Sequence, residues 1–480
     1  MTTSTAELDR LTTAAVAAAP IWRTSDATTR AGWLRALADA LDAHAAELVE
    51  IADRETRLGA TRLTGEVGRT TGQLRLFATV VEEGSYLELT VDDADASATP
   101  PRPELRRLLV GVGPVAVFSA SNFPFAFSVC GGDTASALAA GNPVIIKAHS
   151  GHPELSRRIA EVAIAALTAA GAPAGSLALV EGREAGNVLV QHPAIQAAGF
   201  TGSLSGGRAL FDLASGRPDP IPFYGELGSV NPVVITAAAV AARGAELAAG
   251  LVGSFTLGVG QFCTKPGVVF VPRDGGFAQA VAAAVVDAAG GPLLTDRITA
   301  SFPAGIDALV ADPSVEIIAR GAETADGAQP IVLTTDAGAV ADRSDALLEE
   351  VFGPVTLLVH YDSADDLHRA LRAVPGSLTA TLHAEAGDDV TDTLELLQAR
   401  AGRVLFAGWP TGVAVTWSQQ HGGPWPATTS LHTSVGATAI RRFLRPVVYQ
   451  DAPAALLPAP LRDETLATLP HRRNGVLRVP

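Results

Sequence analysis

A cysteine on a glycine-flanked loop is the leading candidate nucleophile in this sequence. Cys263 stands in G-Q-F-C-T-K-P-G (residues 260–267), where the glycines and the following proline favour a loop over a helix interior. A thiol on such a loop can approach a substrate closely, and a thiolate is a strong nucleophile near neutral pH. The alternative is a buried structural cysteine, the role predicted for Cys130 in the apolar run F-S-V-C-G-G.

Two other polar residues are placed to assist a nucleophile. Glu226, in F-Y-G-E-L-G, precedes an apolar strand, and partial desolvation there would raise its pKa toward that of a general base. Asn122 follows the strand predicted over Val115–Ala120, and its amide can donate a hydrogen bond to a developing oxyanion. An exposed loop acid and a turn-forming asparagine are the respective alternatives.

A glycine-rich turn and two scarce lysines indicate where a nucleotide would bind. F-T-G-S-L-S-G-G (residues 200–207) follows a predicted strand and opens a predicted helix, whose free N–H groups suit a pyrophosphate. Its spacing is not that of the dinucleotide fingerprint G-x-G-x-x-G, so by itself it is only a turn. Lys147 and Lys265 are the two lysines among 35 basic residues, which makes each a candidate for a specific role. Glu350, in E-E-V-F-G-P, is either a surface acid or a ribose-binding carboxylate with Phe352 beside the same ring.

These residues require elements to position them, and the hydrophobic pattern supplies two series of alternating strands and helices. A helical period runs through residues 27–55, and another helix is predicted over Glu154–Ala170. Alternating strands and helices predict parallel sheets covered by helices, in two α/β domains joined near residue 228. Residues 88–108 and the proline-rich end, residues 441–480, read as an excursion and an extended tail. The predicted strands are Val115–Ala120, Pro143–Ala148, Leu177–Glu181, Ala197–Thr201, Pro232–Ile235, Gly267–Pro272, Val315–Ala319, Val355–Tyr361, Ser377–His383 and Arg403–Ala407.

Length and composition exclude several classes of protein. The chain has 480 residues, a formal net charge of −15 and two cysteines. The acidic balance disfavours nucleic acid as a partner, and no apolar stretch is long enough for a membrane span. Two cysteines make no disulfide framework, and no Cys/His cluster has zinc spacing, so no metal site is expected. With no signal peptide at its start, the chain is expected to be cytoplasmic.

Taken together, the motifs resemble those of the aldehyde dehydrogenase superfamily from about residue 25 to 446. The matching segments are S-N-F-P-F, G-N-P-V-I-I-K, G-F-T-G-S, E-L-G-S-V-N-P, G-Q-F-C-T, E-E-V-F-G-P and H-G-G-P-W-P-A-T. The last, with S-V-G and R-R-F-L-R-P, is most similar to the branch of NADP-dependent fatty aldehyde and 2-oxoglutarate semialdehyde (2,5-dioxopentanoate) dehydrogenases. The resemblance implies an NAD(P)-binding domain over 1–227, interrupted at about 88–108, a catalytic domain over 228–425 and a bridging, oligomerisation tail over 426–480. It also implies a homodimer or homotetramer.

The resemblance also implies a role for each motif residue. Cys263 would form a thiohemiacetal and then a thioester, Asn122 would bind the oxyanion, and Glu226 would activate the hydrolytic water. Gly202, Ser203 and Gly207 match the pyrophosphate turn. Lys147 matches the adenosine-ribose lysine, and Glu350 with Phe352 matches the nicotinamide-ribose site.

Cofactor and substrate preferences follow from a few positions. In NAD-preferring relatives an acid stands three residues after the lysine; here Ser150 replaces it, which favours NADP, with NAD as the alternative. His149 and Arg183 are candidates for added positive charge. The lack of a clear arginine pair near Phe125 or Phe127 favours an uncharged medium-chain, long-chain or aromatic aldehyde, with 2-oxoglutarate semialdehyde as the alternative. The aromatic candidates for a substrate funnel are Phe123, Phe125, Phe127, Phe262, Trp417 and Trp425; His421 is a further candidate near the thiol.

Ala407 departs from the family pattern, and three rival functions fit the sequence less well. Ala407 stands where this branch usually has asparagine, which puts the local geometry of the active-site end in question. A coenzyme-A-acylating dehydrogenase is disfavoured because Glu226 would hasten thioester hydrolysis. A cofactor-free cysteine hydrolase would leave the nucleotide motifs unused. A non-catalytic nucleotide-binding homologue would be expected to lose Cys263, Glu226 or Asn122.

Overall fold

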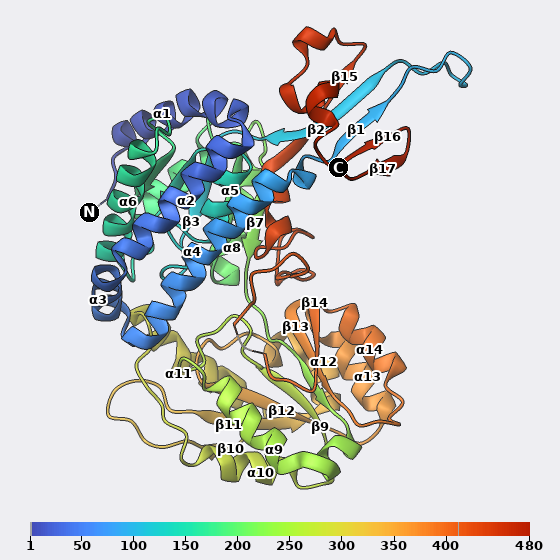
Figure 1. Cartoon of the computed structure of the whole chain (residues 1–480). Coiled ribbons are helices and arrows are strands. Elements are labelled where there is room, and N and C mark those ends of the chain that lie inside the picture. The colour runs from blue at the N-terminus through green and yellow to red at the C-terminus, as the bar shows by residue number, and fades with distance from the viewer. Residues whose placement is uncertain (1, 411) are drawn as a thin grey trace.

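The polypeptide forms two α/β bodies and a projecting β-sheet (Figure 1). The structure is a computed structural model that describes residues 2–410 and 412–480. Each body is a sheet flanked by helices, and the loops between the two bodies meet at the site described below (Figure 1). The predicted α/β class with parallel sheets is confirmed.

The first sheet is parallel throughout, in the order β5-β4-β3-β6-β7. The carboxyl ends of its strands meet at one edge, where open α/β sheets bind ligands. Four strands lie where the hydrophobic runs predicted them. The fifth, β7, was not predicted because F-Y-G-E is short and interrupted by glycine, and Glu226 is its last residue rather than a loop residue. The strands are β3 (Val115–Phe118), β4 (Val144–Lys147), β5 (Leu177–Val180), β6 (Ala197–Thr201) and β7 (Phe223–Glu226); the helices are α5 (Gly132–Ala139), α6 (Pro153–Ala169), α7 (Arg183–Gln191) and α8 (Leu204–Ser215).

An N-terminal group of helices packs beside this sheet. The helices are α1 (Thr5–Thr24), α2 (Ala27–Ala43), α3 (Ala45–Thr56) and α4 (Ala60–Glu83). The helical period predicted over 27–55 is divided at His44, where the backbone leaves helical geometry. Helix α4, which was not predicted, buries Leu63, Val67 and Leu74 against the core. No helix among residues 2–410 and 412–480 has the length and apolarity needed to cross a membrane.

The second sheet has the order β10-β11-β12-β9-β8-β13-β14, with only the edge strand β10 antiparallel to its neighbour. The six predicted strands are found and β11 is added between two of them. The strands are β8 (Val233–Ile235), β9 (Val268–Pro272), β10 (Glu316–Arg320), β11 (Ile331–Asp336), β12 (Val355–Tyr361), β13 (Ser377–His383) and β14 (Ala401–Phe406); the helices are α9 (Ala237–Phe255), α10 (Phe277–Val285), α11 (Asp296–Val310), α12 (Ala337–Leu347), α13 (Ala364–Ala373) and α14 (Thr391–Gln398).

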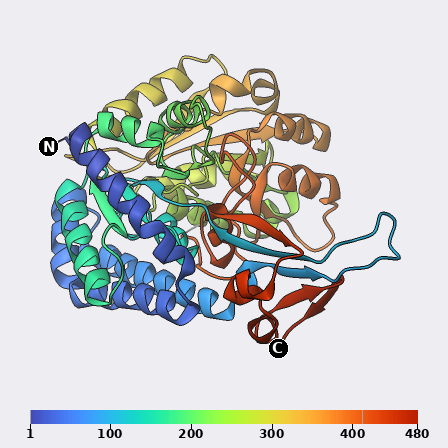
Figure 2. The same ribbon diagram turned by 90° about the horizontal axis from the view of Figure 1, so that it is seen from above.

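The third sheet joins the predicted excursion to the end of the chain. Strands β1 (Leu89–Asp92) and β2 (Leu105–Gly111) form a hairpin, and β15 (Leu444–Gln450) pairs antiparallel with β2. The last strands, β16 (His471–Arg473) and β17 (Val476–Arg478), continue from β1. The tail is therefore part of a five-stranded sheet that projects from the two bodies rather than a separate extended strand (Figure 2).

Candidate active site

The thiol-bearing loop follows α9 and is shaped by glycine. Gly260 has φ +67, and a side chain there would place its Cβ 2.2 Å from the backbone oxygen of Gly353. Only glycine fits such a contact at a left-handed backbone position. The loop therefore packs directly on the E-E-V-F-G-P segment and carries Cys263 between the two bodies.

Two buried side chains, those of Asn231 and Lys265, fix the backbone of the Cys263 loop by hydrogen bonds. The amide of Asn231 donates hydrogen bonds to the backbone oxygens of Cys263, at 2.8 Å, and Lys265, at 2.9 Å. The ammonium of Lys265 donates to the backbone oxygens of Val351, at 2.8 Å, and Val355, at 3.0 Å. The scarce Lys265 thus positions the nucleophile loop. Asn231, which has φ +50, is a positioning residue that sequence reasoning missed.

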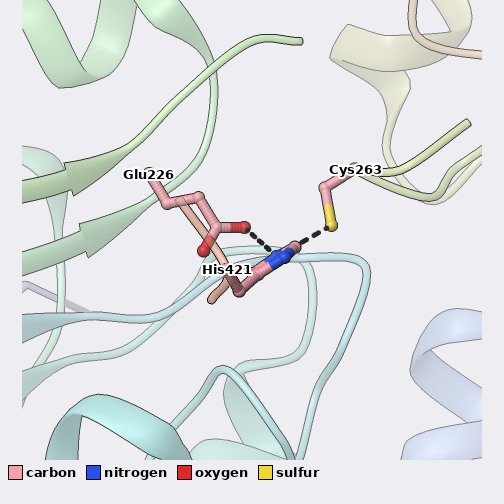
Figure 3. A group of neighbouring side chains, drawn as sticks. All are labelled: Glu226, Cys263 and His421. Carbon is pink, nitrogen blue, oxygen red and sulfur yellow. Dashed lines mark hydrogen bonds and ion pairs between the residues drawn. The ribbon is translucent and has the colours of Figure 1, made fainter. Parts of the chain in front are cut away.

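Cys263, His421 and Glu226 come together through one nitrogen atom (Figure 3). The Nε2 atom of His421 lies 3.6 Å from the Cys263 Sγ and 2.9 Å from the Glu226 Oε1. The imidazole is fully buried, and its Nδ1 atom has no partner among the described residues. When Nε2 carries no hydrogen of its own, it can therefore take a proton directly from the thiol, and the protonated ring then donates to the Glu226 carboxylate.

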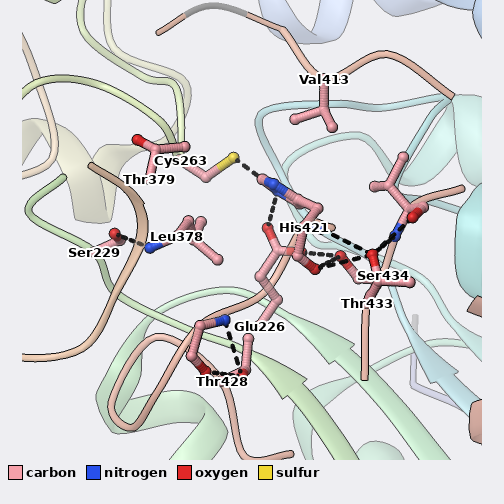
Figure 4. Close-up of polar contacts among 12 residues, drawn as sticks. Glu226, Ser229, Cys263, Leu378, Thr379, Val413, His421, Thr428, Thr433 and Ser434 are labelled. Carbon is pink, nitrogen blue, oxygen red and sulfur yellow. Dashed lines mark hydrogen bonds and ion pairs between the residues drawn. The ribbon is translucent and has the colours of Figure 1, made fainter. Parts of the chain in front are cut away.

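The Glu226 carboxylate is fixed on its other side by a hydroxyl. Ser434, in the S-V-G motif, donates a short hydrogen bond to Oε2, and its Oγ also lies 3.2 Å from the backbone oxygen of His421 (Figure 4). Burial disfavours the carboxylate, but the charge and hydrogen bond of His421, the bond from Ser434 and the charge of Arg442 hold the pKa of Glu226 below its ordinary value. The predicted upward shift is wrong because polar partners outweigh desolvation.

The thiol is held in its neutral form. Burial raises the pKa of Cys263 well above its ordinary value, and the charges of Glu226 and Glu350 raise it further. The positive charges of Arg69 and Arg403 act in the opposite direction. Formation of the thiolate therefore requires a neighbouring base, and the Nε2 atom of His421 lies 3.6 Å from the Sγ atom.

Asn122 lies beside the same loop. Its Nδ2 atom donates to the backbone oxygen of Gln261 at 3.0 Å, which leaves a second amide hydrogen for another acceptor. The backbone oxygen of Asn122 accepts a hydrogen bond of 2.6 Å from Arg62. The Asn122 amide therefore contacts the backbone two positions before Cys263 in the sequence.

Positive groups gather at the strand ends where a dinucleotide would lie. Lys147 ends β4, and its pKa is lowered by burial and by the nearby charge of Arg183. Ser203 caps α8, with Gly202 before it and Gly207 in its second turn, and Arg297 donates to the Ser203 hydroxyl at 3.3 Å. These residues fit an anionic cofactor, because helix N-termini and cations both favour phosphate.

One predicted source of positive charge is not available. His149 is largely buried, and burial with the neighbouring charges of His152, Lys147 and Arg297 lowers its pKa to about 3. The ring is therefore neutral at pH 7, and its Nδ1 accepts a hydrogen bond from the Gly151 backbone at 3.0 Å. Ser150, by contrast, is exposed.

Glu350 is half-buried, and the charge of Lys265 on the thiol loop acts on its carboxyl group. Burial raises its pKa to about 7, while the charge of Lys265 and a hydrogen bond from the Ser229 backbone oppose that shift. Its Oε2 also lies close to the backbone at Gly228. Phe352 is half-buried. The ribose-binding roles of Glu350 and Phe352 stay predictions.

The aromatic candidates divide into three groups. Phe262, Phe123 and Phe127 form a chain of ring contacts with centroid separations of 5.2 and 5.4 Å, and the Phe127 ring lies 6.3 Å from that of His421. Phe125 instead belongs to the hydrophobic core beside the first sheet. Trp417 and Trp425 are surface side chains, 46% and 49% exposed. The substrate roles of these aromatic residues stay predictions.

Arginines that sequence reasoning did not identify lie against these rings. Arg62 covers Phe123 and Phe262, at 5.2 and 4.9 Å from the ring centroids, and Arg69 covers Phe127 at 5.2 Å. The expectation of no clear arginine pair near Phe125 or Phe127 is wrong, because α4 supplies both arginines from far away in the sequence. Arg403, on β14, acts electrostatically on the Cys263 thiol.

Ala407 follows β14 in a left-handed conformation, with φ +51. Among residues other than glycine, asparagine adopts this conformation most readily. Alanine in place of the family's asparagine therefore raises the free energy of the local backbone conformation. Strand β14, which precedes Ala407, is intact.

Comparisons with known proteins show the family of this chain. The model of the aldehyde dehydrogenase family matches residues 1–444. Alpha-ketoglutaric semialdehyde dehydrogenase 2 of Azospirillum brasilense is 46% identical over 480 residues, covering 98% of this chain and 91% of that protein. The alpha-ketoglutaric semialdehyde dehydrogenase of Acinetobacter baylyi is 44% identical over 486 residues, covering 99% and 92%.

Solved structures show the same fold at low sequence identity. Aldehyde dehydrogenase 21 of Physcomitrella patens, in complex with the reaction product succinate, superposes with a TM-score of 0.79 at 20% identity, covering 95% of this chain and 92% of that one. The chain belongs to the aldehyde dehydrogenase family, whose members are NAD(P)-dependent oxidoreductases acting on small-molecule aldehydes.

Proposed function

We propose that this enzyme oxidises 2-oxoglutarate semialdehyde to 2-oxoglutarate, with NADP as the preferred cofactor. Two relatives of at least 44% identity, aligned over nearly the whole chain, bear the alpha-ketoglutaric semialdehyde dehydrogenase name. They favour the alternative substrate over the uncharged aldehyde that the aromatic residues indicated. The observation that carries the chemistry is the contact of one His421 nitrogen with both the Cys263 thiol and the Glu226 carboxylate.

The reaction begins with proton removal from the thiol. In the tautomer that carries its hydrogen on Nδ1, His421 takes the thiol proton at Nε2, and Sγ attacks the aldehyde carbon to form a C–S bond. The oxygen of the aldehyde gains negative charge, which the free amide hydrogen of Asn122 and the backbone N–H of Cys263 stabilise. The intermediate is a thiohemiacetal on Cys263.

Oxidation and hydrolysis then follow as separate steps. The nicotinamide cofactor supplies, when bound, an acceptor for the hydride that leaves the former aldehyde carbon. Cys263 is left in a thioester. Glu226 removes a proton from the attacking water, the C–S bond breaks and the carboxylic acid is released. The departing thiolate regains the proton held by His421, and Glu226 gives up the water proton to solvent.

Groups for holding the cofactor gather at the carboxyl ends of the first sheet. Lys147 and Arg183 suit the adenosine ribose and a 2′-phosphate, and the α8 N-terminus with Gly202, Ser203 and Gly207 suits the pyrophosphate. Ser150 supports NADP because it places no negative charge opposite a 2′-phosphate. Glu350 and Phe352 are assigned to the nicotinamide ribose.

The test is production of reduced cofactor at 340 nm from 2-oxoglutarate semialdehyde, hexanal and benzaldehyde, each with NADP and with NAD. The proposal predicts the highest kcat/KM for the semialdehyde with NADP, and loss of activity in Cys263→Ala. A higher kcat/KM for hexanal would overturn the substrate assignment, and a higher value with NAD would overturn the cofactor assignment. Product release that requires coenzyme A would establish the acylating alternative.

A further inference from the structure

Three arginines near the thiol loop carry buried hydrogen-bond donors that no described residue satisfies. The buried atoms without a partner among the described residues include Nη1 of Arg62, Nη1 of Arg69, and both Nε and Nη2 of Arg403. A buried donor without an acceptor costs free energy, and the cost is larger for a charged group. Such groups persist where a ligand supplies the acceptors.

The positions of these arginines are fixed by aromatic rings and by the backbone. Arg62 and Arg69 stand seven residues apart on α4 and therefore lie on the same helical face. Arg62 stacks on Phe123 and Phe262, and Arg69 on Phe127, whose ring is next to His421. Stacking holds a guanidinium plane while leaving its edge free for a carboxylate.

The charges of two of these groups reach the nucleophile. Arg69 and Arg403 both act electrostatically on the Cys263 thiol. The other bonds of Arg69 are weak, since its Nε and Nη2 atoms each lie 3.4 Å from the backbone oxygen of Val413. A short substrate bound to the thiol at one end therefore has cationic donors within reach of its other end.

We infer that Arg69, together with Arg62 and Arg403, binds the 2-oxo carboxylate end of the substrate and selects short aldehydes that carry a distal carboxylate. This inference rests on the proposed function and adds the residues that recognise the substrate. The carboxylate accepts the unpartnered guanidinium hydrogens, and the phenylalanines between them pack on the methylene carbons of the substrate.

Glu66 does not neutralise the group. Its Oε1 accepts the backbone N–H groups of Phe125 and Ala126, at 2.9 and 3.0 Å. Burial raises the pKa of Glu66, and the charges of Arg62 and Arg69 only partly oppose that shift. The cluster of Arg62, Glu66 and Arg69 is therefore positively charged on balance.

The test compares two substrates of the same chain length in matched variants. We would measure kcat/KM for 2-oxoglutarate semialdehyde and for pentanal in wild type, Arg69→Met, Arg62→Met and Arg403→Met. Arg75→Met is the control, because Arg75 lies on the same helix but is exposed and paired with Asp39 and Asp42. For Arg69→Met the ratio of the two kcat/KM values should fall by at least about thirtyfold, chiefly through KM, and for Arg75→Met it should not change.

Protection of the Cys263 thiol from alkylation measures carboxylate binding independently of turnover. 2-Oxoglutarate should protect Cys263 from iodoacetamide in wild type and in Arg75→Met, but not in Arg69→Met, whereas hexanoate should protect none of them. Equal losses for both substrates in the arginine variants, or protection that survives in Arg69→Met, would overturn the inference while leaving the proposed function intact. A wild type that is inactive on the semialdehyde would overturn the proposed function, and the protection assay would still decide whether a carboxylate binds at these arginines.

Discussion

The imidazole of His421 and the carboxylate of Glu226 form a buried pair in which Nε2 and Oε1 lie 2.9 Å apart. The same nitrogen faces the nucleophilic thiol at 3.6 Å. Removing one of the three groups therefore changes the protonation of the other two, and this coupling gives the first two predictions.

Replacing Glu226 with glutamine should make the resting thiol more acidic. The pKa of Cys263 is raised first by burial and then by the negative charges of Glu226 and Glu350. Removing one charge stabilises the thiolate, so its pKa falls and the thiolate fraction at pH 7.5 rises. We expect iodoacetamide to alkylate Glu226→Gln about threefold to tenfold faster than wild type. Glu349→Gln, which removes an exposed neighbouring acid, should react like wild type.

Replacing His421 with asparagine should remove the path for the proton between thiol and carboxylate. The expected loss in kcat is about 10²-fold to 10⁴-fold, the usual contribution of a positioned acid–base group. NADP binding, followed by quenching of tryptophan fluorescence, should not change. The matched control is His432→Asn, since His432 is an exposed histidine nearby. A kcat within threefold of wild type in His421→Asn would show that Glu226 acts without the imidazole.

Replacing Ala407 with asparagine should stabilise the protein. Ala407 has φ +51, a conformation that costs an ordinary residue roughly 1–2 kcal/mol and asparagine less. We expect the free energy of unfolding in urea to rise by about 1 kcal/mol. Ala311→Asn is the control, because Ala311 is exposed with a right-handed φ of −66 and should gain nothing. Destabilisation by Ala407→Asn would contradict this explanation of the departure from the family pattern.

Replacing Ser150 with glutamate should shift the cofactor preference. A carboxylate three residues after Lys147 repels a 2′-phosphate and accepts hydrogen bonds from free ribose hydroxyls. We expect kcat/KM for NADP to fall at least about tenfold, with NAD unchanged or improved, because close like charges are costly. Ser150→Ala, which adds no charge, should keep the NADP preference. Equal effects on the two cofactors would remove Ser150 from the specificity determinants.

Parallel strands were the most predictable part of this fold. Val355–Tyr361 and Ser377–His383 are short apolar runs bounded by turn residues, and the structure begins and ends both strands at the predicted residues. Strand β7 escaped prediction because its four residues include glycine, tyrosine and glutamate. Its stability comes from pairing with β6, which local pattern does not reveal.

The site was predictable where motifs carry it and not where packing assembles it. Cys263, Glu226 and His421 stand in recognisable sequence motifs, whereas Arg62 and Arg69 belong to a helix about two hundred residues from the thiol. Their seven-residue spacing places them on one face of that helix, but only the packing of α4 against the Phe123 and Phe127 segment brings that face to the nucleophile. The lowered pKa of Glu226 was likewise unpredictable, because Ser434 and Arg442 lie more than two hundred residues away.

The central claim is that Cys263 carries a thioester which Glu226 and His421 hydrolyse. The most direct test is intact mass spectrometry of Glu226→Gln after mixing with NADP and 2-oxoglutarate semialdehyde, with reduced cofactor followed at 340 nm. We expect at most one reduced cofactor per subunit, and an adduct on Cys263 whose mass is that of the substrate less two hydrogens. Continued turnover at the wild-type rate, or reduced cofactor without any adduct on Cys263, would contradict it.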